Sequence, residues 1–232
     1  MVGAVLASVL VLVGTFSVAR WGTMVPGRLQ LLVEFPFEWL AGIVRGTGGK
    51  RWREFAGLVI AIFLFVLVAN FIGLLPGVGT VGLVHEEHGE STLIPIVRAA
   101  AADLNFTLGL AIIAFVAFVA WGIRANGVRG YLKELLIAEP AYMTPVLTPI
   151  HLISELSRLI SLSMRLFGNV FAGEVLLAVM LALAPIFIPV GFLILEAIFG
   201  FVQALVFALL TMTYITLAIA EHLHHEPQTE TG

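Results

Sequence analysis

The chain alternates between long apolar segments and short segments rich in arginine, glutamate, proline or glycine. A run of about 18 or more apolar residues can cross the hydrocarbon core of a bilayer as a helix. Such runs predict three spans in the first part of the chain: Val2 to Ala19, Phe55 to Leu75, and about Leu93 to Ile123. An amphipathic segment from Pro26 to Val44 separates the first two spans and is typical of a helix at a membrane surface.

The C-terminal third predicts two helices that are longer than a bilayer is thick. The helical pattern from about Pro149 to Ala184 would be about 50 Å long, against a hydrocarbon core of about 30 Å. Pro185 and Pro189 then end this pattern, and a second segment of similar length runs from Val190 to about His222. We therefore expect a long hairpin of strongly tilted helices. Its first half carries several polar residues: His151, Glu155, Arg158, Ser161 and Arg165.

These segments predict an all-α integral membrane protein with about five membrane segments. Residues 1–232 form a single membrane domain, in which residues 1–144 hold the peripheral spans and the amphipathic segment. Residues 145–232 hold the tilted hairpin and a polar tail from about residue 223. The composition agrees, because 60% of the residues are hydrophobic and only 12% are charged. The absence of cysteine excludes disulfides and Cys-ligated metals, and a net charge of -3 argues against nucleic acid as a partner.

The distribution of basic residues predicts the orientation of the chain. No Lys or Arg precedes the first span and Arg20 follows it, which is the reverse of the charge layout of a signal peptide. We therefore expect a retained span with the N-terminus outside, because basic residues stay on the cytoplasmic side. The loop after the second span contains glutamates but no Lys or Arg, so it is placed outside. The C-terminus is then cytoplasmic, in a multi-pass protein of a cell membrane, with a bacterial plasma membrane as the default.

Arg165 lies within an apolar run of the first hairpin helix. Spacings of three, four and four residues place Arg158, Ser161, Arg165 and Asn169 on one face of that helix. Glu174, nine residues after Arg165, falls on the opposite face and cannot simply neutralise it. An arginine keeps its proton inside proteins, and a cation at bilayer depth costs about 3 kcal/mol or more. Arg165 is therefore a candidate member of a charge pathway.

The second hairpin helix carries its own row of polar residues. Glu196, Gln203 and Tyr214 align, because they are seven and eleven residues apart. They could simply form hydrogen bonds across the hairpin, as buried polar side chains generally do. In the alternative hypothesis, Glu174 and Glu196 approach each other across the turn and define a hydrated half-channel, with Asn169 and Gln203 as neutral members.

The remaining polar motifs favour no catalytic or metal chemistry. Glu155 and Arg158, three residues apart, fit an ion pair on a helix surface. The segment His85 to His88 is one residue short of the zinc-protease motif H-E-x-x-H. No phosphate-binding loop or nucleophile motif occurs, so we expect neither an enzyme nor a metal site. Three further polar residues in the outer half of the third span could line an outer entrance or form a local backbone cap at a helix start: Asp103, Asn105 and Thr107.

Several segments together resemble the a subunit of F-type ATP synthases. The resemblance covers about residues 20 to 222. The segments that carry it are Val25-Pro26-Gly27-Arg28-Leu29-Gln30, Asn70 followed by Gly73-Leu74-Leu75-Pro76, Ala102-Asp103-Leu104-Asn105-Phe106-Thr107, the block from Ser161 to Glu174, and Gln203 with the ending near Glu221-His222. The chain departs from the family pattern in the plain alanine run that precedes Asp103.

The resemblance implies a role for each member of the polar rows. Arg165 corresponds to the essential stator arginine of the family, and Glu174 and Glu196 correspond to acidic positions of its outer proton half-channel. Gln203 corresponds to the glutamine that faces the arginine across the hairpin, and Asn169 to a polar position of the same pathway. Four further residues are possible channel-lining residues: Asp103, Asn105, Ser161 and Tyr214.

The same resemblance implies a function and partners. Two offset aqueous half-channels would deliver protons to and from the carboxylates of a rotating ring, which couples proton flow to ATP synthesis. The implied partners are a ring of small rotor subunits with a buried carboxylate, a peripheral stalk subunit and the lipid bilayer. The chain itself would be a non-catalytic subunit without a cofactor.

A self-contained, proton-coupled secondary transporter is the main alternative. In that hypothesis Arg165 binds an anionic substrate and the acidic residues couple its transport to protons. The sequence shows no internal repeat of the kind on which many such transporters are built, and it predicts only about five membrane segments. An intramembrane enzyme is a weaker alternative, because no nucleophile or metal constellation occurs.

Overall fold

The computed structural model describes residues 2–20, 28–47, 52–75, 82–87, 90–95, 99–136, 144–183 and 188–220. It consists of six α-helices, a β-hairpin and a short 3₁₀ helix within these ranges. The elements in chain order are α1 (Val2–Arg20), α2 (Arg28–Thr47), α3 (Trp52–Gly73), β1 (Gly82–Glu87), β2 (Glu90–Pro95), η2 (Ala100–Ala102), α4 (Leu104–Leu136), α5 (Thr144–Leu183) and α6 (Ile188–Ala220).

The predicted all-α membrane architecture is confirmed. Four of the described helices contain segments that are long and apolar enough to cross a membrane: Trp52–Gly73, Leu104–Ala125, Thr148–Leu183 and Pro189–Ile219. Helix α1 adds a shorter apolar segment, Val2–Phe16. The predicted long hairpin is also present, because α5 has 40 residues and α6 has 33. At 1.5 Å per residue these helices are about 60 Å and 50 Å long, so neither can cross a bilayer upright.

The predicted start of the third span, at about Leu93, is wrong. Leu93 lies in β2, where it pairs with Val84 of the antiparallel hairpin, and α4 begins only at Leu104. The apolar residues that follow Leu93 made the run look continuous, but the strand pairing already satisfies the backbone there. Asp103 then starts the helix, because its carboxylate accepts a hydrogen bond of 2.9 Å from the backbone N–H of Asn105. This is the capping role that the sequence left open for Asp103.

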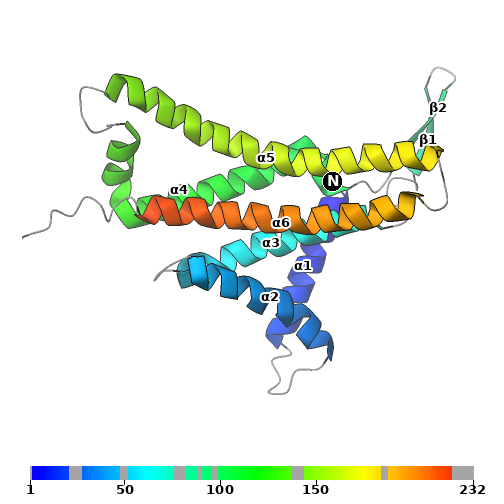
Figure 1. Cartoon of the computed structure of the whole chain (residues 1–232), viewed down its shortest axis with the longest axis horizontal. Helices are drawn as coiled ribbons and strands as arrows, with labels where there is room; N and C mark the ends of the chain where they lie inside the picture. The colour runs from blue at the N-terminus through cyan, green and yellow to red at the C-terminus, as the bar shows by residue number, and fades with distance from the viewer. Residues whose placement is uncertain are drawn as a thin grey trace, which may run out of the picture.

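Helix α6 is the centre of the packing. It contacts α3, α4 and α5, whereas α1 and α2 pack mainly against α3. Figure 1 shows α5 and α6 lying alongside each other, with α1 running across their direction. The core between the long helices contains large, fully buried side chains: Phe63, Leu166, Phe207, Met212 and Ile215. One flank of α5 covers this core and the other flank remains exposed.

The amphipathic segment forms α2, as predicted, and aromatic contacts attach it to its neighbours. The Trp39 ring lies 6.1 Å from the Phe201 ring of α6. Six residues further along α2, the Arg45 guanidinium lies 5.0 Å from the centre of the Trp52 ring, at the start of α3. An arginine over an indole face gains cation–π attraction while its charge stays solvated. These contacts hold α2 beside α3 and α6 at the end where the basic residues gather.

Helix α4 bends at Gly127, where the backbone has φ 70° and ψ 159°. Only glycine adopts this conformation without strain, because a Cβ atom would clash with the neighbouring backbone. Beyond the bend, Tyr131 lies so close to Gly122 that a Cβ on Gly122 would come within 2.9 Å of the tyrosine ring. Two glycines therefore shape this end of α4: Gly122 through its close contact with Tyr131, and Gly127 through its dihedral angles.

Replacing Gly127 by alanine should strain the bend by about 1–3 kcal/mol. We expect Gly127→Ala to lower the thermal stability of the chain within its purified complex. Gly109→Ala is the matched control, because Gly109 lies in the same helix with no atom near the position of its Cβ and alanine favours helix there. Equal stability of the two variants in thermal unfolding would contradict the strained bend.

Candidate functional site

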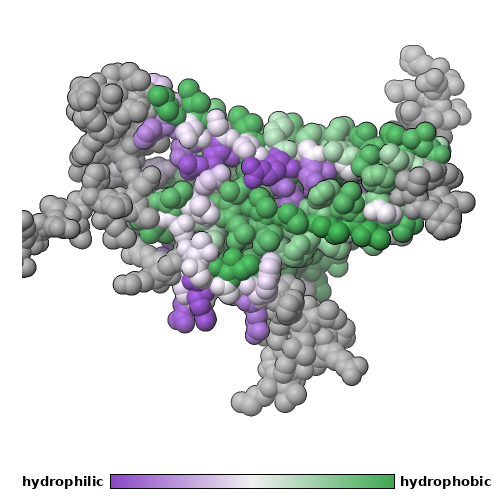
Figure 2. All heavy atoms as spheres, in the orientation of Figure 1, coloured by the Kyte–Doolittle hydropathy of each residue, from purple (hydrophilic) through white to green (hydrophobic). Residues whose placement is uncertain are grey.

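Helix α5 has a buried face and an exposed face in the middle of its length. Leu162, Ser163, Leu166 and Val170 are buried against α4 and α6, and their spacing follows one side of a helix. Arg165 lies on the other side and is exposed. Figure 2 shows patches of hydrophilic atoms interrupting an otherwise apolar surface in this part of the molecule. The structure thus presents Arg165 outward from the protein.

Arg165 has no hydrogen-bonding or ion-pair partner within the part of the chain that the structure describes. Glu174 does not neutralise it, as the helical spacing predicted. That glutamate is half-buried and interacts electrostatically with Glu196 of α6. The guanidinium therefore stands on an apolar surface without an acidic partner from the described part of its own chain. A group that cannot lose its proton needs a polar or anionic partner from outside when this surface enters a membrane.

A cavity of about 150 Å³ opens between α5 and α6. Asn169 and Glu196, both members of the predicted polar rows, contribute its polar groups. The volume is large enough for several water molecules, and these two side chains offer them hydrogen bonds. The other lining residues are small or apolar: Ala172, Gly173, Leu176, Phe192, Leu195 and Phe199.

Gly173 gives the Glu196 carboxyl its place in this cavity. A Cβ atom on Gly173 would lie 2.5 Å from Glu196 Oε1 and 2.8 Å from its carboxyl carbon. Real Cβ atoms do not approach other atoms this closely, so any larger residue at position 173 would displace the carboxyl. Because Gly173 has no side chain, the Glu196 carboxyl of α6 can lie against α5.

Gln203 is buried at the interface of α6 with its neighbours, at 8% exposure. Its Nε2 atom has no hydrogen-bond partner, and neither does Oδ1 of Asn70, which is also buried. The Asn70 amide nitrogen donates to the carbonyl oxygen of Gly200 at 3.0 Å and so connects α3 to α6. No hydrogen bond joins Gln203 to Arg165 within the described chain. The unused groups of Gln203 and Asn70 make this interface a polar region next to the hairpin.

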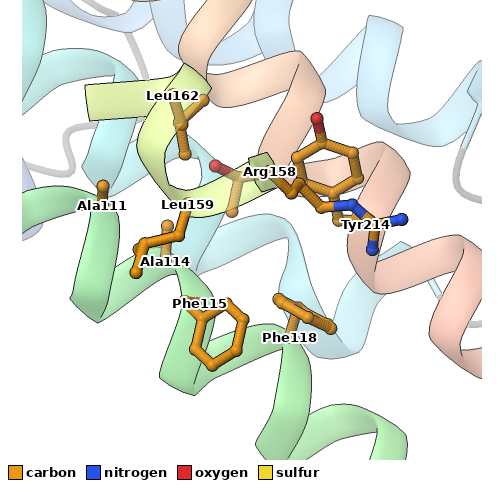
Figure 3. Close-up of a pocket in the computed structure, with 9 residues that line it drawn as sticks. Ala111, Ala114, Phe115, Phe118, Arg158, Leu159, Leu162 and Tyr214 are labelled. Atoms are coloured by element: carbon orange, nitrogen blue, oxygen red, sulfur yellow. The ribbon is translucent and has the colours of Figure 1, made fainter. Parts of the chain in front are cut away.

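Tyr214 and Arg158 form a separate cluster towards the other end of the hairpin. The Arg158 guanidinium lies 4.4 Å from the centre of the Tyr214 ring and 5.7 Å from that of Phe118. It also pairs with Glu155 at 3.0 Å, as predicted from their spacing. Figure 3 shows the Arg158 side chain beside Tyr214, with Phe118 below them. Arg158 lies seven residues before Arg165 in α5, where it is half-buried and packs on α4 and α6.

The other predicted lining residues lie apart from the cavity. Ser161 is exposed one turn before Arg165, and Asn105 is exposed in the first turn of α4. Asp103 is half-buried and caps α4. No group of three or more His, Cys, Asp or Glu side chains suited to a metal occurs among the residues for which the structure gives a position.

Three features of this region were not inferred from the sequence. The first is the space that Gly173 leaves for the Glu196 carboxyl. The second is the hydrogen bond between Asn70 and Gly200, and the third is the buried hydrogen bond between Thr107 and Ser163. Each involves a glycine or a polar residue inside an apolar helix. A polar residue at such a position indicates a contact in the folded protein, because a lone polar group there is costly without a partner. The identity of the partner depends on how the helices pack.

Comparison with known proteins shows the family of the chain. The profile of the family described as "ATP synthase A chain" matches residues 1–216. The "ATP synthase subunit a" of Gloeobacter violaceus is 37% identical over 218 residues, which cover 93% of this chain and 82% of that protein. The protein of the same name from Gluconobacter oxydans is 36% identical, with 93% and 85% covered. That of Mycobacterium ulcerans is 38% identical, with 88% and 79% covered. The chain therefore belongs to the ATP synthase A chain family.

Proposed function

We propose that this chain is the proton-translocating stator subunit of an F-type ATP synthase. In this function it delivers protons to the carboxylates of a rotating ring through one aqueous half-channel and takes them away through another. The observation that carries the proposal is the exposed Arg165 on the outer face of α5, without a partner in the described part of its own chain. A rotor carboxylate is the partner that would complete this surface.

Arg165 would act as an electrostatic barrier. A rotor carboxylate that faces lipid keeps its proton, because desolvation disfavours the charged form. Beside Arg165, at about 4 Å and an effective dielectric constant near 20, the charged form gains about 4 kcal/mol. The carboxylate then releases its proton on one side of the arginine and takes up another on the opposite side. A proton can cross only by riding the ring through most of a turn.

The cavity between α5 and α6 would be part of the outer half-channel. It contains the Glu196 carboxyl and the Asn169 amide, and Glu174 lies near enough to interact electrostatically with Glu196. The two carboxyls can exchange protons with bound water and the Asn169 amide can form hydrogen bonds with that water, whereas the phenylalanine and leucine walls offer no polar path. Gln203 and Tyr214 are proposed members of the hairpin's polar row rather than of this cavity.

The proposed orientation places the N-terminus outside and the C-terminus in the cytoplasm of a multi-pass protein in a bacterial plasma membrane. The basic Arg45 and Arg53 lie at the junction of α2 and α3, at the end assigned to the cytoplasm. A peripheral stalk subunit would hold the chain still while the ring turns. Membership of the ATP synthase family favours this assembly over a self-contained transporter.

We predict that Arg165→Lys abolishes most proton-driven ATP synthesis in vesicles. A lysine lacks the planar guanidinium and can lose its proton. If it recovers only about half of the 4 kcal/mol attraction, the rate falls about thirtyfold. Arg124→Lys, at an exposed arginine of α4, is the matched control and should leave synthesis unchanged. Synthesis near the normal rate in Arg165→Lys would refute the barrier.

We predict that Glu196→Gln slows proton uptake about tenfold or more, because an amide cannot relay a proton as a carboxyl does. The measurement is passive proton flux through the membrane sector after the nucleotide-binding part has been removed. Glu38→Gln, at an exposed glutamate of α2, controls for loss of negative charge. Unchanged flux with the complex intact would exclude Glu196 from the path.

We predict that Gly173→Ala slows the same flux about three- to tenfold, because the new methyl group displaces the Glu196 carboxyl by an amount that matters for proton transfer. Gly191→Ala is the matched control, since Gly191 lies in α6 with no atom near its Cβ position. The two variants should assemble equally well. Equal flux through both would show that the position of the carboxyl is not important.

A further inference from the structure

A buried pair of hydroxyl groups joins α4 to α5 close to Arg165. Thr107 Oγ1 and Ser163 Oγ lie 3.2 Å apart, and the two residues are 0% and 1% exposed. The Thr107 hydroxyl has one proton, which it donates to the carbonyl oxygen of Leu104 at 3.0 Å. Ser163 is therefore the donor in the bond between the helices.

The buried neighbours of this bond along the two helices are apolar. On α4 the neighbouring buried residues are Ala111 and Ala114, and on α5 they are Leu162 and Leu166. Contacts between such side chains are non-directional, so they resist separation of two helices more than they resist rotation of one helix about its axis. A hydrogen bond depends on direction and distance, and a buried hydroxyl that loses its partner is costly. The Ser163–Thr107 bond therefore restricts the rotation of α5.

The rotation of α5 determines where Arg165 points. Ser163 precedes Arg165 by two residues, which places the two side chains on nearly opposite sides of the helix. With Ser163 held against α4, Arg165 is directed outward. A turn of about 20° moves a group carried about 6 Å from the helix axis by about 2 Å. Such a shift is a large fraction of the distance over which an ion pair acts.

We infer that the Ser163–Thr107 hydrogen bond is a positioning device that fixes the rotation of α5 and hence the direction of Arg165. Neither hydroxyl touches the translocated proton in this arrangement; both act through the arginine. The inference rests on the proposed function of Arg165, but the rotation itself can be measured independently of proton flow.

The functional test uses the assembled complex in vesicles and measures ATP-driven proton pumping per ATP hydrolysed. Ser163→Ala and Thr107→Val each remove one partner and should lower this ratio about three- to tenfold, the population change that one hydrogen bond controls. Thr107→Ser keeps the hydroxyl and should restore the ratio. Thr211→Val is the matched control, because Thr211 is equally buried and its hydroxyl bonds only within α6, to Phe207.

The geometric test uses single cysteines, because the chain contains none of its own. Cysteines at the exposed Met164 and at the buried Leu162 are alkylated with a membrane-permeant maleimide in the same complex. In the Ser163→Ala background the ratio of the rate at position 164 to that at position 162 should fall about threefold or more. The Thr211→Val background should leave that ratio unchanged.

The outcomes separate the two hypotheses. Pumping by Ser163→Ala equal to that of Thr211→Val, or lost pumping with an unchanged alkylation ratio, overturns the positioning role. If Thr107→Val, which leaves the Ser163 hydroxyl without its acceptor, does not assemble, the double variant Ser163→Ala with Thr107→Val leaves no orphaned hydroxyl and should assemble with the altered alkylation ratio. A fully active Arg165→Lys variant would refute the proposed function of Arg165, whereas the alkylation ratio would still report the orientation of α5.

Discussion

The arrangement of this chain depends on keeping one permanent cation on the exposed side of a helix whose other side is packed. Burial of Leu166 and Val170 orients α5, and the same packing leaves Arg165 outside. Hydrophobic burial stabilises the helix in this position, because rotating it would expose apolar side chains and bury a guanidinium that cannot lose its proton. The packing of the core thus determines where the Arg165 guanidinium lies, and the stability of the core does not depend on that charge.

Helix α6 has the complementary role, since it carries polar groups inward. Glu196 lies over Gly173 of α5, and the carbonyl of Gly200 accepts a hydrogen bond from Asn70 of α3. In both contacts a glycine lets a polar side chain approach the backbone of a neighbouring helix, which explains why small residues occur at these crossings. The polar groups of α6 therefore lie within the protein, whereas Arg165 of α5 lies on its surface.

The sequence predicted the helices well where one signal dominated. Apolar length predicted α3, α5 and α6, and the spacing of Glu155 and Arg158 predicted their ion pair. The prediction failed at Leu93, where hydropathy could not distinguish a strand followed by alanines from a span. Contacts between distant helices were also beyond the sequence. The Thr107–Ser163 bond joins residues 56 positions apart. Nothing in the local sequence of either helix indicates which residue of the other helix is the partner.

The positions of the acid pair and the arginine support a path that is interrupted within this chain. Glu174 follows Arg165 by nine residues, which corresponds to about 13 Å along the helix and to the opposite side of it. Between Arg165 and Glu174, α5 has one polar side chain, Asn169, which lines the cavity beside Glu196, and an amide does not relay a proton as a carboxyl does. The apolar residue Phe171 lies exposed between these levels. In the proposed mechanism, a carboxylate of the ring is the carrier that takes the proton past Arg165.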